Sequence, residues 1–264
     1  MPIILKTRRE IEMMRKAGLI ANRILRMMRE AAVVGVSTLQ LDMLARDEMD
    51  KVGAIALSRN YPTYKEGEGF PGYTCISVNE EVVHGIPGPR QLKEADVVTL
   101  DLAMSHEGYC ADTAITVPVG KVSPVARKLL DVTRQTLDLA LEHMKPGRKW
   151  SDIARLMQHN VESQGFSVVR EFVGHGIGRS MHEDPKVPNF VTFEQLRGDF
   201  ELRPGMTLAV EPMVVAGRRD VKLLADQWTV ITEDRLPAAH FEHTVAITST
   251  GIDVLTDGRP APTL

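Results

Sequence analysis

Four carboxylates of this sequence stand within, or directly after, stretches that are otherwise apolar. They are Asp101, Asp112, Glu211 and Glu242. Aspartate is depleted in strands, and a single strand carboxylate is usually solvated. Four carboxylates in predicted sheet repel one another wherever they meet, so a shared cation that offsets this repulsion is the simplest explanation.

The two aspartates lie on the two arms of a predicted hairpin. Residues 97–103 and 111–119 have the composition of strands, and the turn between them is Ser-His-Glu-Gly at residues 105–108. With the turn centred between its second and third residues, Asp101 faces Asp112 directly. Like charges opposed in this way, about 5 Å apart, destabilise a sheet. The alternatives are a bound cation, or an aspartate that points to solvent or pairs with an arginine.

Three histidines occur in glycine-containing segments. His175 lies in Gly-His-Gly-Ile-Gly, His182 in Met-His-Glu-Asp-Pro and His84 in Val-His-Gly-Ile-Pro. An isolated histidine is more often packed or exposed than a ligand, but three beside four carboxylates indicate a site. An oxygen-rich set with an imidazole suits Mn²⁺, Fe²⁺, Co²⁺ or Zn²⁺, and two metals about 3.5–4 Å apart are a recurring device for hydrolysis. The predicted ligands are Asp101, Asp112, His175, Glu211 and Glu242.

The apolar periodicity predicts the elements that position these residues. Amphipathic helices are expected at 8–33, 37–52, 123–143 and 151–164, and further strands at 206–214, 228–232 and 241–248. Residues 54–80 are glycine-rich and are expected to form loops. The order of helices followed by strands therefore occurs twice, which predicts an α+β fold with helices backing an antiparallel sheet.

A shift of 112 residues aligns parts of the two halves. It superposes Gly35 on Gly147 and Gly53 on Gly165. This match is either a chance similarity of helices with the same period or the trace of a duplication. A duplication predicts one catalytic domain over residues 1–264, with related halves at about 1–120 and 121–255 and a site where they meet.

Composition narrows the class of protein. The 264 residues are 43% apolar, and 32 basic against 35 acidic residues give a net charge of −3. No basic stripe predicts nucleic-acid binding, and no apolar run approaches the roughly 18 residues of a membrane span. We expect no signal peptide. Two cysteines, Cys75 and Cys110, make no disulfide framework and fit a reducing cytoplasm.

Taken together, these motifs resemble type I methionine aminopeptidases, whose duplicated fold is called pita-bread. The resemblance covers nearly the whole chain, to about Val254. The absence of a long insertion between His175 and Glu242 argues against the type II form. The motifs that carry it are Val82-Val-His-Gly-Ile-Pro, Leu100-Asp-Leu-Ala, Cys110-Ala-Asp-Thr-Ala, Gly174-His-Gly-Ile-Gly, Met181-His-Glu-Asp-Pro, Ala209-Val-Glu-Pro and Phe241-Glu-His-Thr.

The resemblance implies a function and a role for each site residue. The reaction is removal of the initiator methionine from nascent polypeptides by two divalent metals, with Glu211 moving the proton of the attacking water. His182 faces the developing oxyanion, and His84 contacts the peptide nitrogen beyond the scissile bond. The resemblance also implies a monomer that can contact ribosomes.

The methionine pocket implied by the resemblance contains Phe70, Cys75 and Trp228, although Trp228 could also be an ordinary core aromatic. Either Tyr61 or Tyr64 fills a further aromatic place. A monovalent cation is expected near Asn79, a position that by itself is typical of an ordinary turn.

Three features depart from the pattern of this family. Met181 replaces a phenylalanine, His240 replaces a glutamine, and the loop at residues 58–70 is longer than usual. They concern the shape of the specificity pocket more than the metals. The alternatives to methionine removal are an X-Pro peptidase of the same fold, a metal-free binding module on this scaffold, and a structural protein with coincidental carboxylates.

Overall fold

The computed structural model describes residues 2–62 and 69–259. Its first two helices begin at capping boxes. At the start of α1 (Arg8–Ala31), the side chain of Thr7 accepts a hydrogen bond from the backbone N–H of Glu10. The backbone N–H of Thr7 in turn donates to the carboxylate of Glu10. Ser37 and Gln40 do the same for α2 (Thr38–Lys51). Both helices were predicted to within two residues, because capping signals are local.

In the second helix pair, only the first helix has a side-chain cap at its N-terminus. Ser123 caps α3 (Pro124–His143), which has proline at its first turn, and α4 (Trp150–Ser163) follows it. A short helix, α5 (Phe193–Arg197), was not predicted. It has only five residues, too few for apolar periodicity to reveal. Among the described residues, every helix is too short or too polar to span a bilayer.

All strand pairs are antiparallel, as predicted. The central sheet has the order β1-β4-β5-β14-β9-β7-β8, with β2 paired to β4 and β15 to β14. Its strands are β1 (Ile55–Ala56), β2 (Cys75–Val78), β4 (Val97–His106), β5 (Tyr109–Pro118), β7 (Gly174–Gly176), β8 (Glu183–Val187), β9 (Thr207–Val210), β14 (Glu242–Ile247) and β15 (Ile252–Val254). Two three-stranded sheets flank it, β13-β10-β6 and β11-β12-β3. Their strands are β3 (Glu81–Val83), β6 (Ser167–Val168), β10 (Met213–Val215), β11 (Val221–Leu223), β12 (Val230–Thr232) and β13 (Ala238–His240).

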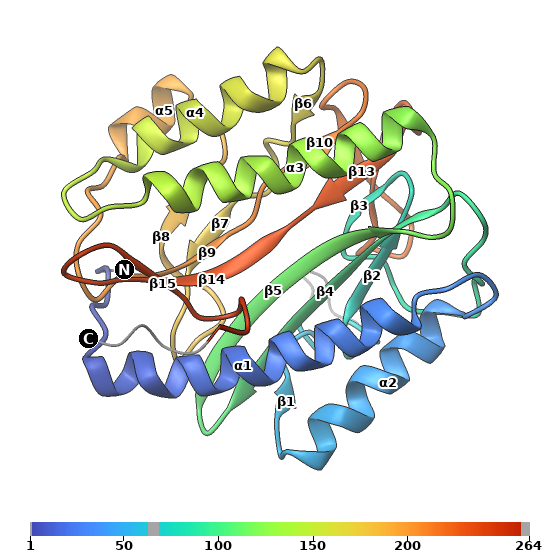
Figure 1. Cartoon of the computed structure of the whole chain (residues 1–264), viewed down its shortest axis with the longest axis horizontal. Coiled ribbons are helices and arrows are strands. Elements are labelled where there is room, and N and C mark those ends of the chain that lie inside the picture. Colours follow the sequence, from blue (N-terminus) through green and yellow to red (C-terminus); the bar gives the residue numbers. More distant parts are fainter. Residues whose placement is uncertain (1, 63–68, 260–264) are drawn as a thin grey trace.

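The helices cover one face of the central sheet. In Figure 1, α1 lies over β4 and β5, and α2 lies beside α1 and contacts β1 and β2. Helices α3 and α4 pack against each other, with α3 on β13 and β10 and α4 on β6. Leu100 and Leu102 of β4 share a buried core with Ile24 of α1. A second core joins Met157 of α4 to Val245 of β14. This confirms the α+β prediction, whereas the origin of the two halves by duplication stays a prediction.

The register of the β4–β5 hairpin differs from the prediction. Asp101 pairs with Ala114 and Asp112 with Ala103, so the two aspartates are diagonal neighbours rather than directly opposed. The turn is Glu107-Gly108, with φ of 51° and 79°. Two residues with positive φ form the tightest hairpin turn, and the non-glycine Glu107 concealed it in the sequence. Both aspartates still lie on one face of the sheet, because Asp112 is two positions from Ala114, the partner of Asp101.

Other strand boundaries in the structure differ from the predicted ones for local reasons. The strand predicted at 206–214 is divided into β9 and β10 at Pro212, which has no N–H to donate. The strand predicted from Trp228 begins at Val230, because Asp226 accepts the N–H groups of Trp228 and Thr229 in a turn. Strands β2 and β3 fall in or beside the segment predicted to be loops and are only four and three residues long.

Candidate metal centre

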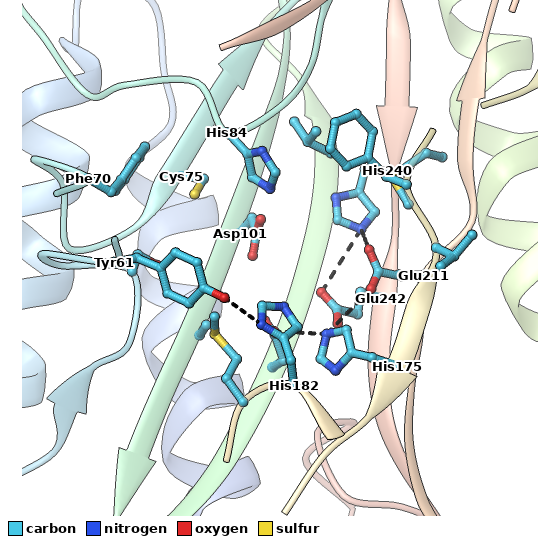
Figure 2. Close-up of a pocket in the computed structure, with 18 of the residues that line it drawn as sticks. Tyr61, Phe70, Cys75, His84, Asp101, His175, His182, Glu211, His240 and Glu242 are labelled. Atoms are coloured by element: carbon cyan, nitrogen blue, oxygen red, sulfur yellow. Dashed lines mark hydrogen bonds and ion pairs between the residues drawn. The ribbon is translucent and has the colours of Figure 1, made fainter. Parts of the chain in front are cut away.

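One pocket of about 210 Å³ contains every site residue predicted from the sequence. Figure 2 shows the carboxylates and histidines converging on it from both halves of the central sheet. The predicted residues that line it are Phe70, Cys75, His84, Asp101, Asp112, His175, His182, Glu211, Trp228 and Glu242.

Three of the carboxylates surround a single small residue on the same face of the sheet. Ala114 of β5 pairs with Asp101 on one side and with Glu242 on the other. Asp112 lies two residues away on the same strand and therefore on the same face. The methyl group of Ala114 leaves space between three acidic side chains that a larger residue would occupy.

Threonines hold the two strands together at this point. The N–H of Asp112 donates to Oγ1 of Thr244 (3.0 Å), and the Thr244 hydroxyl donates to the carbonyl of Asp112 (2.8 Å). The Thr113 hydroxyl donates to the carbonyl of Glu242 (3.0 Å). These bonds fix the backbones of two acidic residues on β5 and β14, so their carboxylates cannot separate without breaking them.

His175 stands between two glycines that admit no side chain. A Cβ at Gly174 would lie 2.3 Å from the carbonyl oxygen of Ala209, and one at Gly176 would lie 2.2 Å from that of Asp184. The Nδ1 atom of His175 lies 2.9 Å from the carbonyl oxygen of Gly176. Because a carbonyl only accepts, Nδ1 carries the proton and Nε2 keeps its lone pair for a ligand.

That lone pair points at two carboxylates. Nε2 of His175 lies 3.7 Å from Oε1 of Glu211 and 3.9 Å from Oδ2 of Asp112. Glu211 directly follows β9, and its carbonyl accepts the side-chain amide of Asn189 (3.0 Å). Its other carboxylate oxygen, Oε2, faces His240.

Burial shapes the charge of the site. It raises the pKa of Asp101, Glu211 and Glu242 well above the ordinary range, and the neighbouring charge of Asp112 raises them further. Burial also raises the pKa of Asp112 to about 6, and it lowers the pKa of His175. Such crowding is costly for the protein alone and favourable for bound cations.

The donor set fits divalent metals. Ligand atoms of Asp112, His175 and Glu242 lie within 4.8 Å of one another. Oδ1 of Asp112 and Oε1 of Glu242 are buried and have no hydrogen-bond partner. Buried oxygens in native proteins are rarely left unpaired, so these two are placed as ligands would be.

A wall of aromatic and imidazole rings faces the carboxylates. The rings of Phe70 and Trp228 meet edge to face at 5.2 Å. The Tyr61 hydroxyl lies 2.9 Å from Nδ1 of His182, whose ring lies 4.4 Å from that of His175. Trp228 is half-buried and lines the pocket, so it is not an ordinary core aromatic.

The histidines on this wall are neutral near pH 7. Burial lowers the pKa of His84 to about 4 and, together with His175, lowers that of His182. A neutral imidazole can donate one hydrogen bond without adding charge.

Comparison with known proteins agrees with this geometry. The model of metallopeptidase family M24 matches residues 12–249. The chain belongs to this family. Methionine aminopeptidase 1 of Bacillus subtilis is 48% identical over 254 residues, which cover 96% of this chain and 99% of that protein. Methionine aminopeptidase of Clostridium acetobutylicum is 45% identical over 255 residues, covering 96% and 98%.

A solved M24 structure has the same fold. The crystal structure of methionine aminopeptidase from Thermotoga maritima superposes with a TM-score of 0.89 at 40% identity, covering 97% of this chain and 99% of that one. The resemblance to type I methionine aminopeptidases and the pita-bread fold are thereby confirmed.

Some residues that line the pocket of this M24 member were not predicted from its sequence. Phe172 meets the ring of His84 edge to face at 5.4 Å. It lies three residues before His175, and that proximity was the only signal. The bonds that Thr244, outside the pocket lining, makes to Asp112 were not predicted from the sequence either. Tyr61 lines the pocket, whereas Tyr64 and the rest of residues 63–68 in the long 58–70 loop lie outside the described residues.

The position expected to bind a monovalent cation is a strained turn. Asn79 has φ of 60°, its side chain donates to Asp96 (2.8 Å), and its Oδ1 accepts the N–H of Val97 (2.9 Å). These bonds account for the Asn79 side chain without an ion, and the cation stays a prediction.

Proposed function

We propose that this M24 chain is a methionine aminopeptidase that removes the initiator methionine from nascent polypeptides. The observation that carries the proposal is the pocket itself. Acidic residues and His175 form one wall, and an apolar recess with Phe70 and Trp228 forms the other. The names of relatives that are 45–48% identical over almost the whole chain support it.

Five side chains would hold two divalent ions. Asp101, Asp112 and Glu242 would hold one, and Asp112, His175, Glu211 and Glu242 would hold the other, so Asp112 and Glu242 would serve both. When bound, such ions polarise a carbonyl and lower the pKa of a coordinated water to about 7. Co²⁺, Mn²⁺, Fe²⁺ and Zn²⁺ all suit this set.

The residues around the ions would transfer protons, stabilise developing charge and contact the substrate. Glu211 accepts the proton of the attacking water and delivers it to the leaving amine. Neutral His182, oriented by Tyr61, donates a hydrogen bond to the oxygen on which negative charge develops. His84 contacts the peptide nitrogen beyond the scissile bond, and Phe172 supports its ring.

The methionine side chain lies in the apolar recess. Phe70 is 2% exposed, and the rings of Phe70 and Trp228 pack edge to face. Burial raises the pKa of the Cys75 thiol, so this residue stays neutral and contributes an apolar surface. A pocket of this kind separates side chains by roughly 1–3 kcal/mol per methylene, which predicts slow turnover of norleucine peptides.

We also propose that the protein acts in the cytoplasm as a monomer and meets its substrates as they leave the ribosome. The two cysteines are free and buried, in keeping with a reducing compartment.

The decisive experiment combines metal analysis with two peptides. Purified protein loaded with Mn²⁺ or Co²⁺ is expected to release methionine from Met-Ala-Ser, to lose that activity in EDTA, and to leave Ala-Pro peptides intact. Faster turnover of Ala-Pro peptides would instead support an X-Pro peptidase. Peptide binding without turnover, unchanged by EDTA, would support a metal-free binding module.

A further inference from the structure

A second groove continues outward from the metal-site pocket. Tyr61, His84, Phe172 and Trp228 line both, and the groove of about 620 Å³ then runs between Glu171 and strand β11. A polypeptide with its first residue in the pocket needs a path for the rest of its chain. Because the groove shares a wall with the pocket, it provides a continuous path that passes His84.

A small sheet forms one side of this path. His84 directly follows β3, where Val83 pairs with Val230 of β12, and Val230 pairs in turn with Leu223 of β11. Neighbouring strands lie about 4.8 Å apart, so the edge of β11 is roughly 10 Å from β3. An extended peptide advances about 3.3 Å per residue. It therefore reaches this edge about three residues beyond the position of His84.

The edge of β11 is unpaired in the part of the chain that the structure describes. The strand pairs with β12 on one side only. The N–H of Leu224 donates to the carbonyl of Thr229 (2.9 Å), and the N–H of Glu233 donates to the carbonyl of Asp220 (3.0 Å). The main-chain N–H and C=O groups of the even-numbered residues therefore face β12. The N–H and C=O groups of Val221 and Leu223 therefore point away from it, and Leu223 is 53% exposed.

We propose that the substrate segment beyond the scissile bond pairs as a β-strand with this edge. The main-chain groups of Val221 and Leu223 are the partners, and the inference rests on the proposed function. Strand addition recognises the backbone of a peptide rather than its sequence. That suits an enzyme whose substrates share their first residue and differ in everything that follows.

Uncleavable peptides test the pairing apart from the chemistry. Met-Ala peptides with a reduced scissile amide are titrated into the metal-loaded protein. Their affinity is expected to rise about threefold to tenfold from a tetrapeptide, which ends before the edge of β11, to a heptapeptide, which extends along it, since each added pair of residues gains main-chain hydrogen bonds. N-methylation of successive amides beyond the second residue is expected to weaken binding at alternate positions only, because a strand presents every second N–H to its neighbour.

A pair of variants locates the partner strand. Val221→Pro removes one N–H at the start of an edge strand, where proline is tolerated, whereas Val221→Ala keeps it. The gain in affinity with length is expected to shrink in Val221→Pro and to persist in Val221→Ala. Thermal unfolding of both variants checks that they are folded.

Affinity that is independent of length, or equal sensitivity to every N-methyl group, would overturn the pairing. In that case continued turnover of Met-Ala-Ser would leave the proposed function intact. Conversely, length-dependent binding with alternating sensitivity supports the pairing even if Met-Ala-Ser is not hydrolysed, which would be a failure of the proposed function alone.

Discussion

Nε2 of His240 lies 3.6 Å from Oε2 of Glu211, so this carboxylate has an imidazole near each of its two oxygens. Both ring nitrogens of His240 are buried and have no hydrogen-bond partner. Bonds to the Thr116 hydroxyl hold the backbone N–H and C=O of His240. Burial, and then His84, lowers the pKa of His240 to about 3. The ring is therefore a neutral donor held beside the residue that is proposed to move the proton.

We predict that His240→Ala lowers kcat about tenfold and changes KM by less than about twofold. We expect the 3.6 Å separation between His240 and Glu211 to close to a hydrogen bond during turnover, and the loss corresponds to that one bond to a charged group. His240→Gln is expected to recover most of kcat, because its amide can donate to the same oxygen. Metal content measured on both variants is the control. If His240→Ala loses a metal ion, His240 is a ligand rather than a donor to Glu211.

A second prediction concerns the bridging role of Glu242, which is 2% exposed and pairs with Ala114. Glu242→Ala is expected to bind about one metal ion or none instead of two, because a bridging ligand serves both ions. Elemental analysis after dialysis measures the ratio. Glu194→Ala, which removes an exposed carboxylate from α5, is the matched control. Two ions retained in Glu242→Ala would rule out bridging.

The contrast between predicted and missed features has a physical basis. Helices α1 and α2 could be bounded from the sequence because apolar periodicity is a local signal, and in the structure Thr7 and Ser37 cap them through contacts three residues away. The hairpin register could not, because one non-glycine residue with positive φ, Glu107, shifts every pair along β4 and β5. The true register differs from the predicted one by two positions, so both aspartates still lie on the same face of the sheet.

The candidate metal ligands were easier to single out in the sequence than the residues of the groove. A carboxylate in an apolar strand is unfavourable without a partner, so Asp101 and Glu242 are conspicuous in the sequence. Phe172 and Val221 are apolar residues that follow charged ones, an unremarkable pattern, and they become functional candidates only through their neighbours in space. The resemblance to a family supplied Phe70, Cys75 and Trp228, which composition alone would not distinguish from core residues.

A third prediction separates His182 from the ligands. His182→Ala is expected to lower kcat by about 10²-fold or more and to leave metal binding within about twofold, because its Nδ1 faces Tyr61. Tyr61→Phe, which removes only the hydroxyl that orients the ring, is expected to lower kcat about threefold to tenfold. Steady-state kinetics and metal titration measure the two effects. Equal losses of kcat and metal affinity in His182→Ala would make this residue a ligand.

The last prediction follows from the raised pKa values of the carboxylates. In the metal-free protein, burial and mutual repulsion raise the pKa of Asp101, Glu211 and Glu242 well above its ordinary value, so these groups keep their protons to a higher pH than exposed carboxyl groups do. Metals bind the ionised forms, so loading must expel these protons, and affinity must rise with pH. Calorimetric titration of Mn²⁺ in buffers of different ionisation enthalpy counts the protons released.

We expect at least about one proton to be released per protein near pH 7 and a metal affinity that increases from about pH 6 to about pH 8. The sign is fixed by the direction of the shifts: a carboxyl group with a raised pKa competes with the metal most strongly at low pH. Glu242→Gln, which carries no titratable proton at that position, is expected to release fewer. An observed enthalpy that does not depend on the buffer, with flat affinity over this range, would mean that the carboxylates are already ionised in the metal-free protein.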